Sequence, residues 1–356
     1  MQKYFVDRLG WITEHEFEEI YTLCKLMPGP IAPQFAISIG RRTFGAVGGI
    51  LAGLAFITPA ILIVILIAAL YTQRHVTARQ ELFFHGMQIG AVALIIQSLV
   101  MLFKVHAKKS RSWVLAGLNF ILTRFHPALE PIYILGSGAF GVIRARRAKS
   151  KVAVLRDLSV PLSAAFCGTT LSGSTFFNPV LGNLFWACFK AAAFIFGTGI
   201  AVVPLLEYDF VLKLKWLSHA EFMDALAVGQ ITPGPFVITA TFIGYKVAGL
   251  IGAAVASSGI FLPSFLNILV FVPLFLGRLT SSPYAPDFVS FALPAVVGCI
   301  GAATWKMILL ACSSPRDAAV LAIVTGLQFV RWLPAWGTLL IGALLSTLMG
   351  IGFGAG

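Results

Sequence analysis

Charged side chains are scarce in this sequence. Only 11% of its 356 residues are Asp, Glu, Lys or Arg, whereas soluble domains carry about 25%. Uninterrupted apolar stretches occur at 43–71, 249–277, 288–305 and 333–353, and a membrane-spanning helix needs about 20 such residues. The scarcity of charge therefore argues against a soluble globular domain. Because these stretches do not alternate in polarity with period two, as the strands of a barrel would, we predict an all-α polytopic membrane protein.

Cysteine and histidine are also few. The five cysteines and six histidines include no Cys-x-x-Cys pair and no metal-ligand spacing. This pattern indicates neither a disulfide framework nor a zinc site, and we expect no cofactor. The apolar stretches also lack a nucleophile–base pair, a metal triad and a pair of acids. An intramembrane enzyme, such as a lipid-modifying transferase, is therefore only a weak alternative.

Acidic residues are outnumbered, since 26 Lys and Arg face 14 Asp and Glu and the net charge is +12. The basic residues are not interleaved with aromatic ones, so we expect no nucleic-acid partner. They gather instead between apolar stretches, at 104–111 and 144–156. Such clusters mark the cytoplasmic loops of inner-membrane proteins. We therefore predict a basic cytoplasmic linker at 146–180 in a protein of the bacterial inner membrane, in contact with the lipid bilayer.

The triplet Pro-Gly-Pro occurs twice, at 28–30 and at 233–235, in matching surroundings. A tryptophan, a phenylalanine, several glycines and a later proline recur at an offset of 205 positions up to the triplet and 204 after it. The chain is therefore interpreted as a duplication with repeats at 1–145 and 181–356. In a membrane protein, such a duplication suggests a transport site at the interface of the repeats.

Each triplet follows a short helix that begins with a capping box, Thr13 with Glu16 and Ser218 with Glu221. Proline disfavours helical geometry in the residue before it, so this helix ends near the triplet. The second proline of the triplet suits the first position of a new helix. That new helix is only about 11 residues, or about 16 Å, which is half a bilayer. We predict discontinuous or re-entrant half-helices at both triplets.

Longer helices follow in each repeat. The first of them carries small residues at every fourth position, which favours close packing of helices in lipid; these are Gly45, Gly49 and Gly53 in one repeat and Gly249, Ala253 and Ser257 in the other. Further membrane-spanning helices are predicted at 83–103, 112–124, 129–143, 184–206, 288–311, 317–331 and 333–353. Counting these helices with the positive-inside rule places Arg41 and Lys246, which we take as equivalents, on opposite faces. The repeats are therefore predicted to be inverted.

A helix N-terminus offers free backbone N–H groups and a partial positive charge, so two of them near mid-membrane can form an anion site. The alternative is that the triplets only kink a pair of helices. Lys190, in an apolar stretch, either contributes to the site or extends to the interface. The candidate binding residues are the triplets, the polar residues at equivalent positions around them, and this lysine: Lys25, Pro28, Gly29, Pro30, Gln34, Lys190, Gln230, Pro233, Gly234, Pro235 and Thr239.

The chain resembles the chromate ion transporter family, in its long two-domain form. The second repeat carries the strongest match, with the sequences Phe196-Gly197-Thr198-Gly199, Pro204, Trp216, Phe222, and Gly229 through Pro235 to Thr239, Thr241, Gly244 and Gly249. The first repeat matches from Trp11 through its triplet to Pro59. The resemblance implies an inner-membrane efflux protein for chromate with inverted repeats, and it adds Thr241 to the candidate site. In the family each repeat opens with a helix like that at 184–204; the first repeat has no counterpart, so we expect its first helix to be missing.

The predicted function is export of chromate or a similar tetrahedral oxyanion such as sulfate. An inside-negative potential favours outward movement of each negative charge by about 2.3 kcal/mol per 100 mV, so a coupling ion is not required, although a proton gradient stays open as the driving force. A passive anion channel remains the alternative, because the same helix ends would serve it. The identity of the oxyanion and a homodimer also remain open at this point.

Overall fold

The computed structural model describes residues 3–72, 78–106, 110–149, 178–195, 199–274, 285–331 and 333–353. Within these ranges every regular element is a helix. Four helical segments are long and apolar enough to cross a membrane; these are Ile31–Thr72, Leu82–Lys104, Phe236–Leu274 and Asp287–Ala311. This confirms the predicted all-α membrane protein. Most of the predicted linker, residues 150–177, lies outside the described residues.

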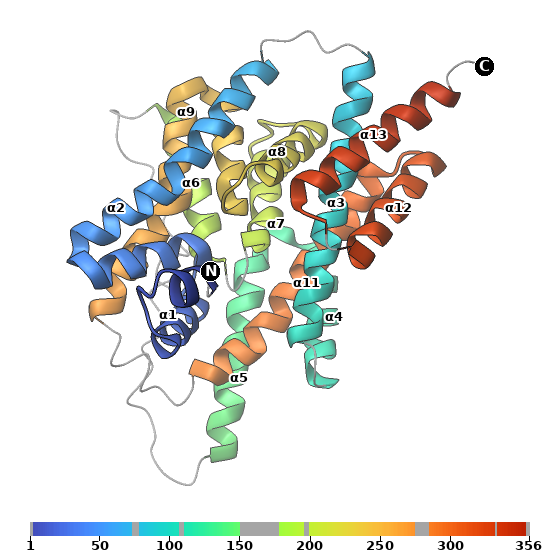
Figure 1. The fold of residues 1–356 in the computed structure, drawn as a ribbon. Coiled ribbons are helices and arrows are strands. Elements are labelled where there is room, and N and C mark those ends of the chain that lie inside the picture. The colour runs from blue at the N-terminus through green and yellow to red at the C-terminus, as the bar shows by residue number, and fades with distance from the viewer. Residues whose placement is uncertain are drawn as a thin grey trace.

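The first half of the chain forms η1 (Lys3–Arg8), α1 (Glu14–Leu26), α2 (Ile31–Thr72), α3 (Ala78–His106), α4 (Ser110–Phe125), η2 (Pro127–Leu129) and α5 (Glu130–Lys149) (Figure 1). The second half forms α6 (Pro179–Ala193), η4 (Gly199–Ala201), α7 (Val202–Glu207), η5 (Tyr208–Lys213), α8 (His219–Ile231), η6 (Phe236–Ile238), α9 (Thr239–Leu266), η7 (Asn267–Phe271), α11 (Ala285–Ala311), α12 (Pro315–Arg331) and α13 (Ala335–Phe353). The helices lie where the sequence predicted them, with one exception.

The exception is the predicted helix at 184–206, which is interrupted. α6 ends at Ala193, Phe194 closes its last turn on the carbonyl of Lys190, and Ile195 is not helical; the next described helical segment begins at Gly199. The prediction of one continuous helix was therefore wrong. Pro204 lies within α7, in its first turn, where a proline is tolerated; the helix therefore breaks before the proline, and hydropathy alone did not reveal the break.

In the first repeat, α1 and the start of α2 form a hairpin whose turn is the triplet at 28–30, hereafter tip 1. The capping box of Thr13 and Glu16 is present at the start of α1. Glu16 also accepts from Arg42 at 2.6 Å, and Cys24 Sγ lies 4.0 Å from Ser38 Oγ. As the residue number rises along α1 from 16 to 24, that of the contacted residue in the next helix falls from 42 to 38. The two helices are therefore antiparallel, and the chain enters and leaves the hairpin on the same side.

The second repeat builds the same hairpin from α8 and the start of the next helix, with the triplet at 233–235, tip 2, as its turn. Ser218 and Glu221 form the capping box, and Glu221 pairs with Lys246 at 3.2 Å. Lys246 therefore occupies the place that Arg42 has in the first repeat, in agreement with the offset of 204. The equivalence of Lys246 with Arg41 was wrong by one position, because Arg41 donates to the carbonyl of Ile268 at 2.9 Å instead.

Both α2 and α9 reverse direction within what is formally one helix. Gly45 has a φ of 67° and Gly249 a φ of 61°, a left-handed conformation that favours glycine. Before each turn lies a short arm, 31–43 or 236–247, and after it a long arm, 46–72 or 250–271. The prediction that Gly45 and Gly249 pack against another helix was wrong, because a Cβ at either position would meet no atom within 4 Å.

The two long arms pack against each other in antiparallel orientation (Figure 1). A Cβ at Gly49 would lie 2.8 Å from the side chain of Leu269, and a Cβ at Gly53 would lie 2.6 Å from Phe265. As the residue number rises on one arm, that of its neighbour falls on the other. The expected packing role of Gly49 and Gly53 is therefore confirmed.

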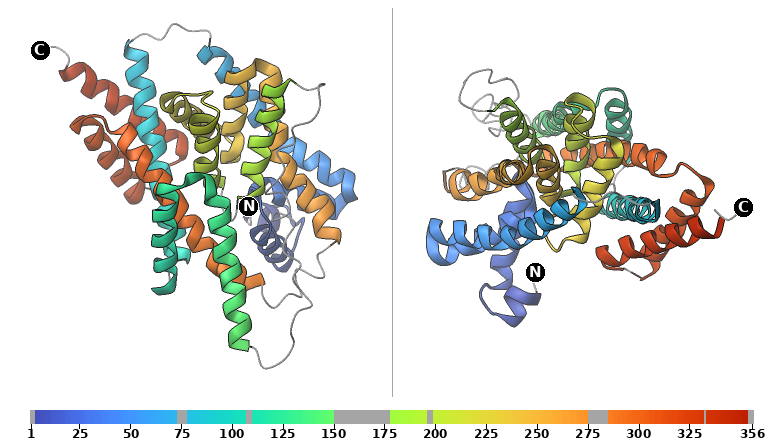
Figure 2. Two further views of the ribbon diagram at one scale, coloured as in Figure 1. Left: turned by 180° about the vertical axis from the view of Figure 1, so that it is seen from behind. Right: turned by 90° about the horizontal axis from the view of Figure 1, so that it is seen from above.

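The remaining helices of each half of the chain pack against helices of the other half (Figure 2). α3 packs against α12 and α13 of the second half, and α11 packs against α4 and α5 of the first. Small residues permit both contacts. Gly342 of α13 approaches Gly86 on α3, and Gly138 of α5, the repeat equivalent of Gly342, approaches Phe288 on α11. The same exchange occurs in both directions, so the two repeats form one structural unit.

Candidate functional site

Tip 1 is a buried turn held by hydrogen bonds from three directions. Gly29 adopts a φ of +115°, and its N–H donates to the carbonyl of Ile195 at 2.7 Å. The carbonyl of Pro28 accepts from Gln34 Nε2 at 2.6 Å and from Asn267 Nδ2 of the second repeat. The proline-rich turn therefore has fixed positions for its carbonyl and N–H groups, and the helix that follows it begins at a defined place.

Only glycine fits at position 29. A Cβ there would lie 2.6 Å from Gln34 Nε2 and 3.4 Å from Ser264 Oγ. Gln34 and Ser264 are both fully buried. The backbone of tip 1 is therefore lined by polar side chains at close range, one from each repeat.

Tip 2 is more open. Pro233 and Gly234 are exposed, whereas Pro235 is buried. Here a Cβ at Gly234 would lie 2.8 Å from the methyl group of Ala60. Ala60 and Ser264 are repeat equivalents that directly follow Pro59 and Pro263, so each tip touches the same position in the long arm of the other repeat. The contacts of the two tips are thus reciprocal, but one is polar and the other apolar.

Both tips lie beside the interruption between α6 and α7. Ile195 accepts from Gly29 of tip 1. A Cβ at Gly199 would lie 3.4 Å from the Cβ of Phe236, the residue after tip 2. Ile195 and Gly199 are four residues apart, so their Cα atoms are separated by at most about 14 Å. The described residues on either side of 196–198 therefore bring the two tips near each other.

Each tip is followed by the N-terminal turn of a short arm, whose first amides have no partner within the helix. At tip 1 the first intrahelical bond runs from the N–H of Gln34 to Pro30 at 3.4 Å, and at tip 2 from Ile238 to Pro235 at 3.0 Å. Thr239 Oγ1 is occupied by the carbonyl of Phe236 at 3.0 Å. The amides and the helix dipoles that point toward the tips favour negative charge there.

The other candidate residues bind neighbouring helices. Gln230 Nε2 donates to the carbonyl of Ala91 at 3.3 Å, and Thr241 Oγ1 lies 2.8 Å from Ser257 Oγ, between the arms of α9. Lys190 Nζ lies 2.6 Å from a carboxylate oxygen of the buried Asp209. This ion pair compensates the charge of Lys190, which neither of its two interpretations anticipated. The side chain of Lys25 lies outside the described residues.

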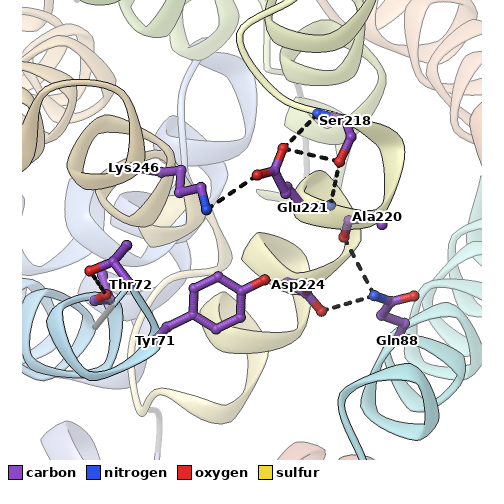
Figure 3. A network of polar contacts seen from close by, with 9 residues as sticks. Tyr71, Thr72, Gln88, Ser218, Ala220, Glu221, Asp224 and Lys246 are labelled. Atoms are coloured by element: carbon purple, nitrogen blue, oxygen red, sulfur yellow. Dashed lines mark hydrogen bonds and ion pairs between the residues drawn. The ribbon is translucent and has the colours of Figure 1, made fainter. Parts of the chain in front are cut away.

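Sequence reasoning missed a polar network at the far end of the second hairpin (Figure 3). Asp224 of α8 is buried and accepts from Tyr71 Oη at 2.6 Å and from Gln88 Nε2 at 2.8 Å. Lys246 Nζ lies 5.3 Å from the centre of the Tyr71 ring while it pairs with Glu221. The network joins the end of α2, the start of α3 and the hairpin of α8. A carboxylate inside an apolar helix was the available signal.

Ser264 and Asn267 were missed as well, and here the sequence offered no signal. Both lie on the long arm of the second repeat, more than 200 residues from the tip that they contact. Their repeat equivalents, Ala60 and Ile63, are apolar, so the comparison of repeats that identified Gln34 and Thr239 could not identify them.

Comparison with known proteins supports one family. A family model described as Chromate transporter matches residues 1–142 and 182–350. The chromate transport protein of Cupriavidus metallidurans is 34% identical over 332 residues, which are 91% of this chain and 80% of that protein. The probable chromate transport protein of Synechococcus elongatus is 33% identical over 313 residues, 85% of this chain and 77% of that protein. No solved structure matches the chain. The resemblance predicted from the sequence is confirmed.

Proposed function

The chain belongs to the chromate transporter family, and from this premise we propose that it exports chromate, or a similar tetrahedral oxyanion such as sulfate, across the bacterial inner membrane. The observation that supports the proposal best is the position of the two tips beside one interruption, at Ile195 and Gly199. Broken helices whose N-termini converge are a recurrent way of binding an anion within a membrane.

In this proposal the oxyanion binds at the starts of the two short arms, close to Pro30 and Pro235. Backbone amides and helix dipoles supply the positive potential, and Gln34 and Thr239 supply polar side chains. No free cation is needed at the site, which lets the anion leave as readily as it binds. Because Lys190 is paired with Asp209, it contributes no net charge to the site.

The hairpins at the tips are proposed to be re-entrant. α1 and α8 have 13 residues each, or about 20 Å at 1.5 Å per residue, which is less than the hydrocarbon core of about 30 Å. The ion pairs of Glu16 with Arg42 and of Glu221 with Lys246 bring the entry and exit of each hairpin together. A hairpin of this length would reach the middle of the bilayer and return.

The repeats are proposed to be inverted, with the pseudo-two-fold axis in the membrane plane. Antiparallel packing of equivalent long arms, through Gly53 against Phe265, supports this relation, as does the reciprocal exchange of helices between the halves. Transport would then occur as helix groups, each with members from both repeats, move around the tips.

Outward movement needs no co-transported ion. With an inside-negative potential, each negative charge that leaves gains about 2.3 kcal/mol per 100 mV. We therefore propose the membrane potential as the driving force, with a proton gradient as the alternative. The buried carboxylates Asp209 and Asp224 are held by partners, whereas Oε2 of the buried Glu130 has no hydrogen-bond partner among the described residues, so both driving forces stay in the proposal.

The test is chromium accumulation in cells that express the gene and in cells that do not, with and without excess sulfate. We expect expression to lower accumulation, and sulfate to diminish the difference if both anions use one site. Equal accumulation in both cell lines would contradict export. Uptake into everted vesicles separates a carrier from a channel, because carrier flux saturates with chromate concentration, whereas channel flux rises linearly.

A further inference from the structure

The hydroxyl of Ser264 is buried without a hydrogen-bond partner among the described residues. The other serines of the same long arm are different: Ser257 and Ser258 each donate to the carbonyl four residues earlier, at 2.7 and 2.8 Å. Ser264 follows Pro263 and makes no such bond. A buried hydroxyl that is left unpaired costs free energy, so its presence calls for a partner that the described residues do not supply.

The unpaired hydroxyl points to tip 1. Ser264 Oγ lies 3.4 Å from the place where a Cβ of Gly29 would stand, and Gln34 Nε2 lies 2.6 Å from the same place. Gln34 Oε1 is also buried and unpaired within the described part of the chain. These polar atoms surround the turn that opens the short arm at 31–43, an arm of three helical turns whose first amides are free. A helix N-terminus and an unpaired buried donor thus converge on one point.

We propose that tip 1 is the oxyanion subsite of the transporter and that Ser264, contributed by the second repeat, donates a hydrogen bond to the bound anion. The inference rests on the proposed function and adds a substrate-binding residue and a location to it. The ligand class is a tetrahedral oxyanion, which accepts from the hydroxyl and from the amides at the start of the short arm. Hydrogen bonds to a charged acceptor are about twice as strong as neutral ones.

The amide of Gln34 can join this site without loss to the turn. The carbonyl of Pro28 accepts from both Gln34 and Asn267. If Gln34 turns toward an anion, Asn267 still satisfies that carbonyl, so no buried acceptor is left unpaired. Asn267 is therefore a positioning residue. Gln34 Nε2 donates to the carbonyl of Pro28 until a bound anion takes the place of that carbonyl as the acceptor.

Tip 2 lacks this arrangement. The equivalents of Ser264 and Asn267 are Ala60 and Ile63, and Ala60 places a methyl group against Gly234. Thr239, the equivalent of Gln34, already donates to Phe236. The two tips therefore contribute unequally to the site: at tip 1 side chains of both repeats can donate to the anion, whereas tip 2 offers mainly the amides at the start of its short arm.

The experiment compares wild-type protein with Ser264→Ala and, as the matched control, Ser258→Ala on the same long arm. Initial chromate uptake into everted vesicles gives KM, and the chromate-dependent rise in the thermal unfolding midpoint of the purified full chain gives binding without transport. We expect Ser264→Ala to raise KM and the half-saturating chromate concentration about tenfold, the loss of one hydrogen bond to a charged group. Ser258→Ala should match wild type in both measurements.

The thermal unfolding midpoint without chromate serves as the control for folding. Ser264→Ala should not lower it, because the removed hydroxyl has no partner to lose. Wild-type KM and wild-type half-saturation in Ser264→Ala would overturn the inference while leaving export intact. A lower uptake with unchanged half-saturation would overturn it too, since the role would then not be in binding. If wild-type vesicles take up no chromate, the proposed function fails, and the binding measurement still decides the subsite.

Discussion

At the scale of single residues, the two tips use glycine for different reasons. Gly29 has a φ of +115°, a conformation that residues with a side chain rarely adopt, so its backbone requires glycine even if the Gln34 side chain moves away. Gly234 has an ordinary φ, and only the methyl group of Ala60 opposes a side chain there. Two identical triplets are therefore under unequal constraint.

We expect Gly29→Ala to lower the free energy of unfolding by about 1–3 kcal/mol, because a residue with a Cβ would be held in a sparsely populated conformation. Gly234→Ala should cost less, since Ala60 can shift by a small amount. The measurement is the thermal unfolding midpoint in detergent. Gly117→Ala is the control, because that helical glycine has open space around it. Equal losses at positions 29 and 234 would contradict the unequal constraint.

At the scale of elements, each hairpin is closed by its own cap. The glutamate of the capping box, Glu16 or Glu221, both accepts from the backbone of the cap residue and pairs with the basic residue at the end of the short arm. One side chain therefore starts the first helix of the hairpin and fixes the end of the second. This explains why the pair Glu16–Arg42 recurs as Glu221–Lys246.

The contribution of Glu16 should depend on pH. The backbone hydrogen bond from Thr13 lowers the pKa of Glu16 below its ordinary value of 4.5. Because the folded pKa is lowered, the stabilisation is complete above the ordinary value and is lost as the pH falls through the folded one. We expect Glu16→Gln, which keeps a capping side chain, to have a lower melting temperature than wild type at about pH 7, and the difference to shrink as the pH falls through the lowered pKa of Glu16.

The control for this titration is Glu18→Gln, which removes an exposed charge from the same helix. Added salt should also narrow the difference between wild type and Glu16→Gln, because the pair with Arg42 is partly exposed. A difference that persists unchanged at low pH would show that Glu16 acts without its charge.

Glycines serve two purposes where the chain reverses between the arms: one allows a positive φ, and the other allows close packing of the arms. Substitution should therefore have different effects at the two kinds of position. Gly249 needs its positive φ but has open space, so Gly249→Ala should cost about 1–2 kcal/mol. Gly244 lies against the backbone of Gly252 and the methyl group of Ala256, and Gly244→Ala should force the arms apart and cost more. Unfolding midpoints of the two variants decide this. A smaller loss for Gly244→Ala would show that the arms are free to separate.

At the scale of the whole molecule, inversion of the repeats makes a prediction about membrane sides. Val47 and Ile251 are repeat equivalents, both 66% exposed, just after the turns between the arms. In a background without other cysteines, we expect an impermeant maleimide to label Ile251→Cys in intact cells and Val47→Cys only after permeabilisation. This assignment follows from the positive-inside rule. Labelling of both from the same side would show that the repeats are parallel.

Much of the fold could be predicted from sequence because its signals are local. The capping boxes, the break at each triplet and the apolar helices depend on neighbouring residues, and each was found where it was predicted. The prediction failed for the helix at 184–206 and for the roles of Gly45 and Gly249. In each case hydropathy indicated a helix: the first ends at Ala193, and at Gly45 and Gly249 a left-handed glycine reverses the chain.

The sequence by itself determined that this is a helical membrane protein built from a duplication, because composition and repetition need no knowledge of contacts. It also indicated the two turns around which the candidate site is arranged. Only the tertiary structure decided that both turns lie beside the interruption after α6 and that Ser264 and Asn267 of one repeat reach the tip of the other. These contacts join residues far apart in the chain and differ between the repeats. Neither local sequence patterns nor a comparison of the repeats can therefore predict them.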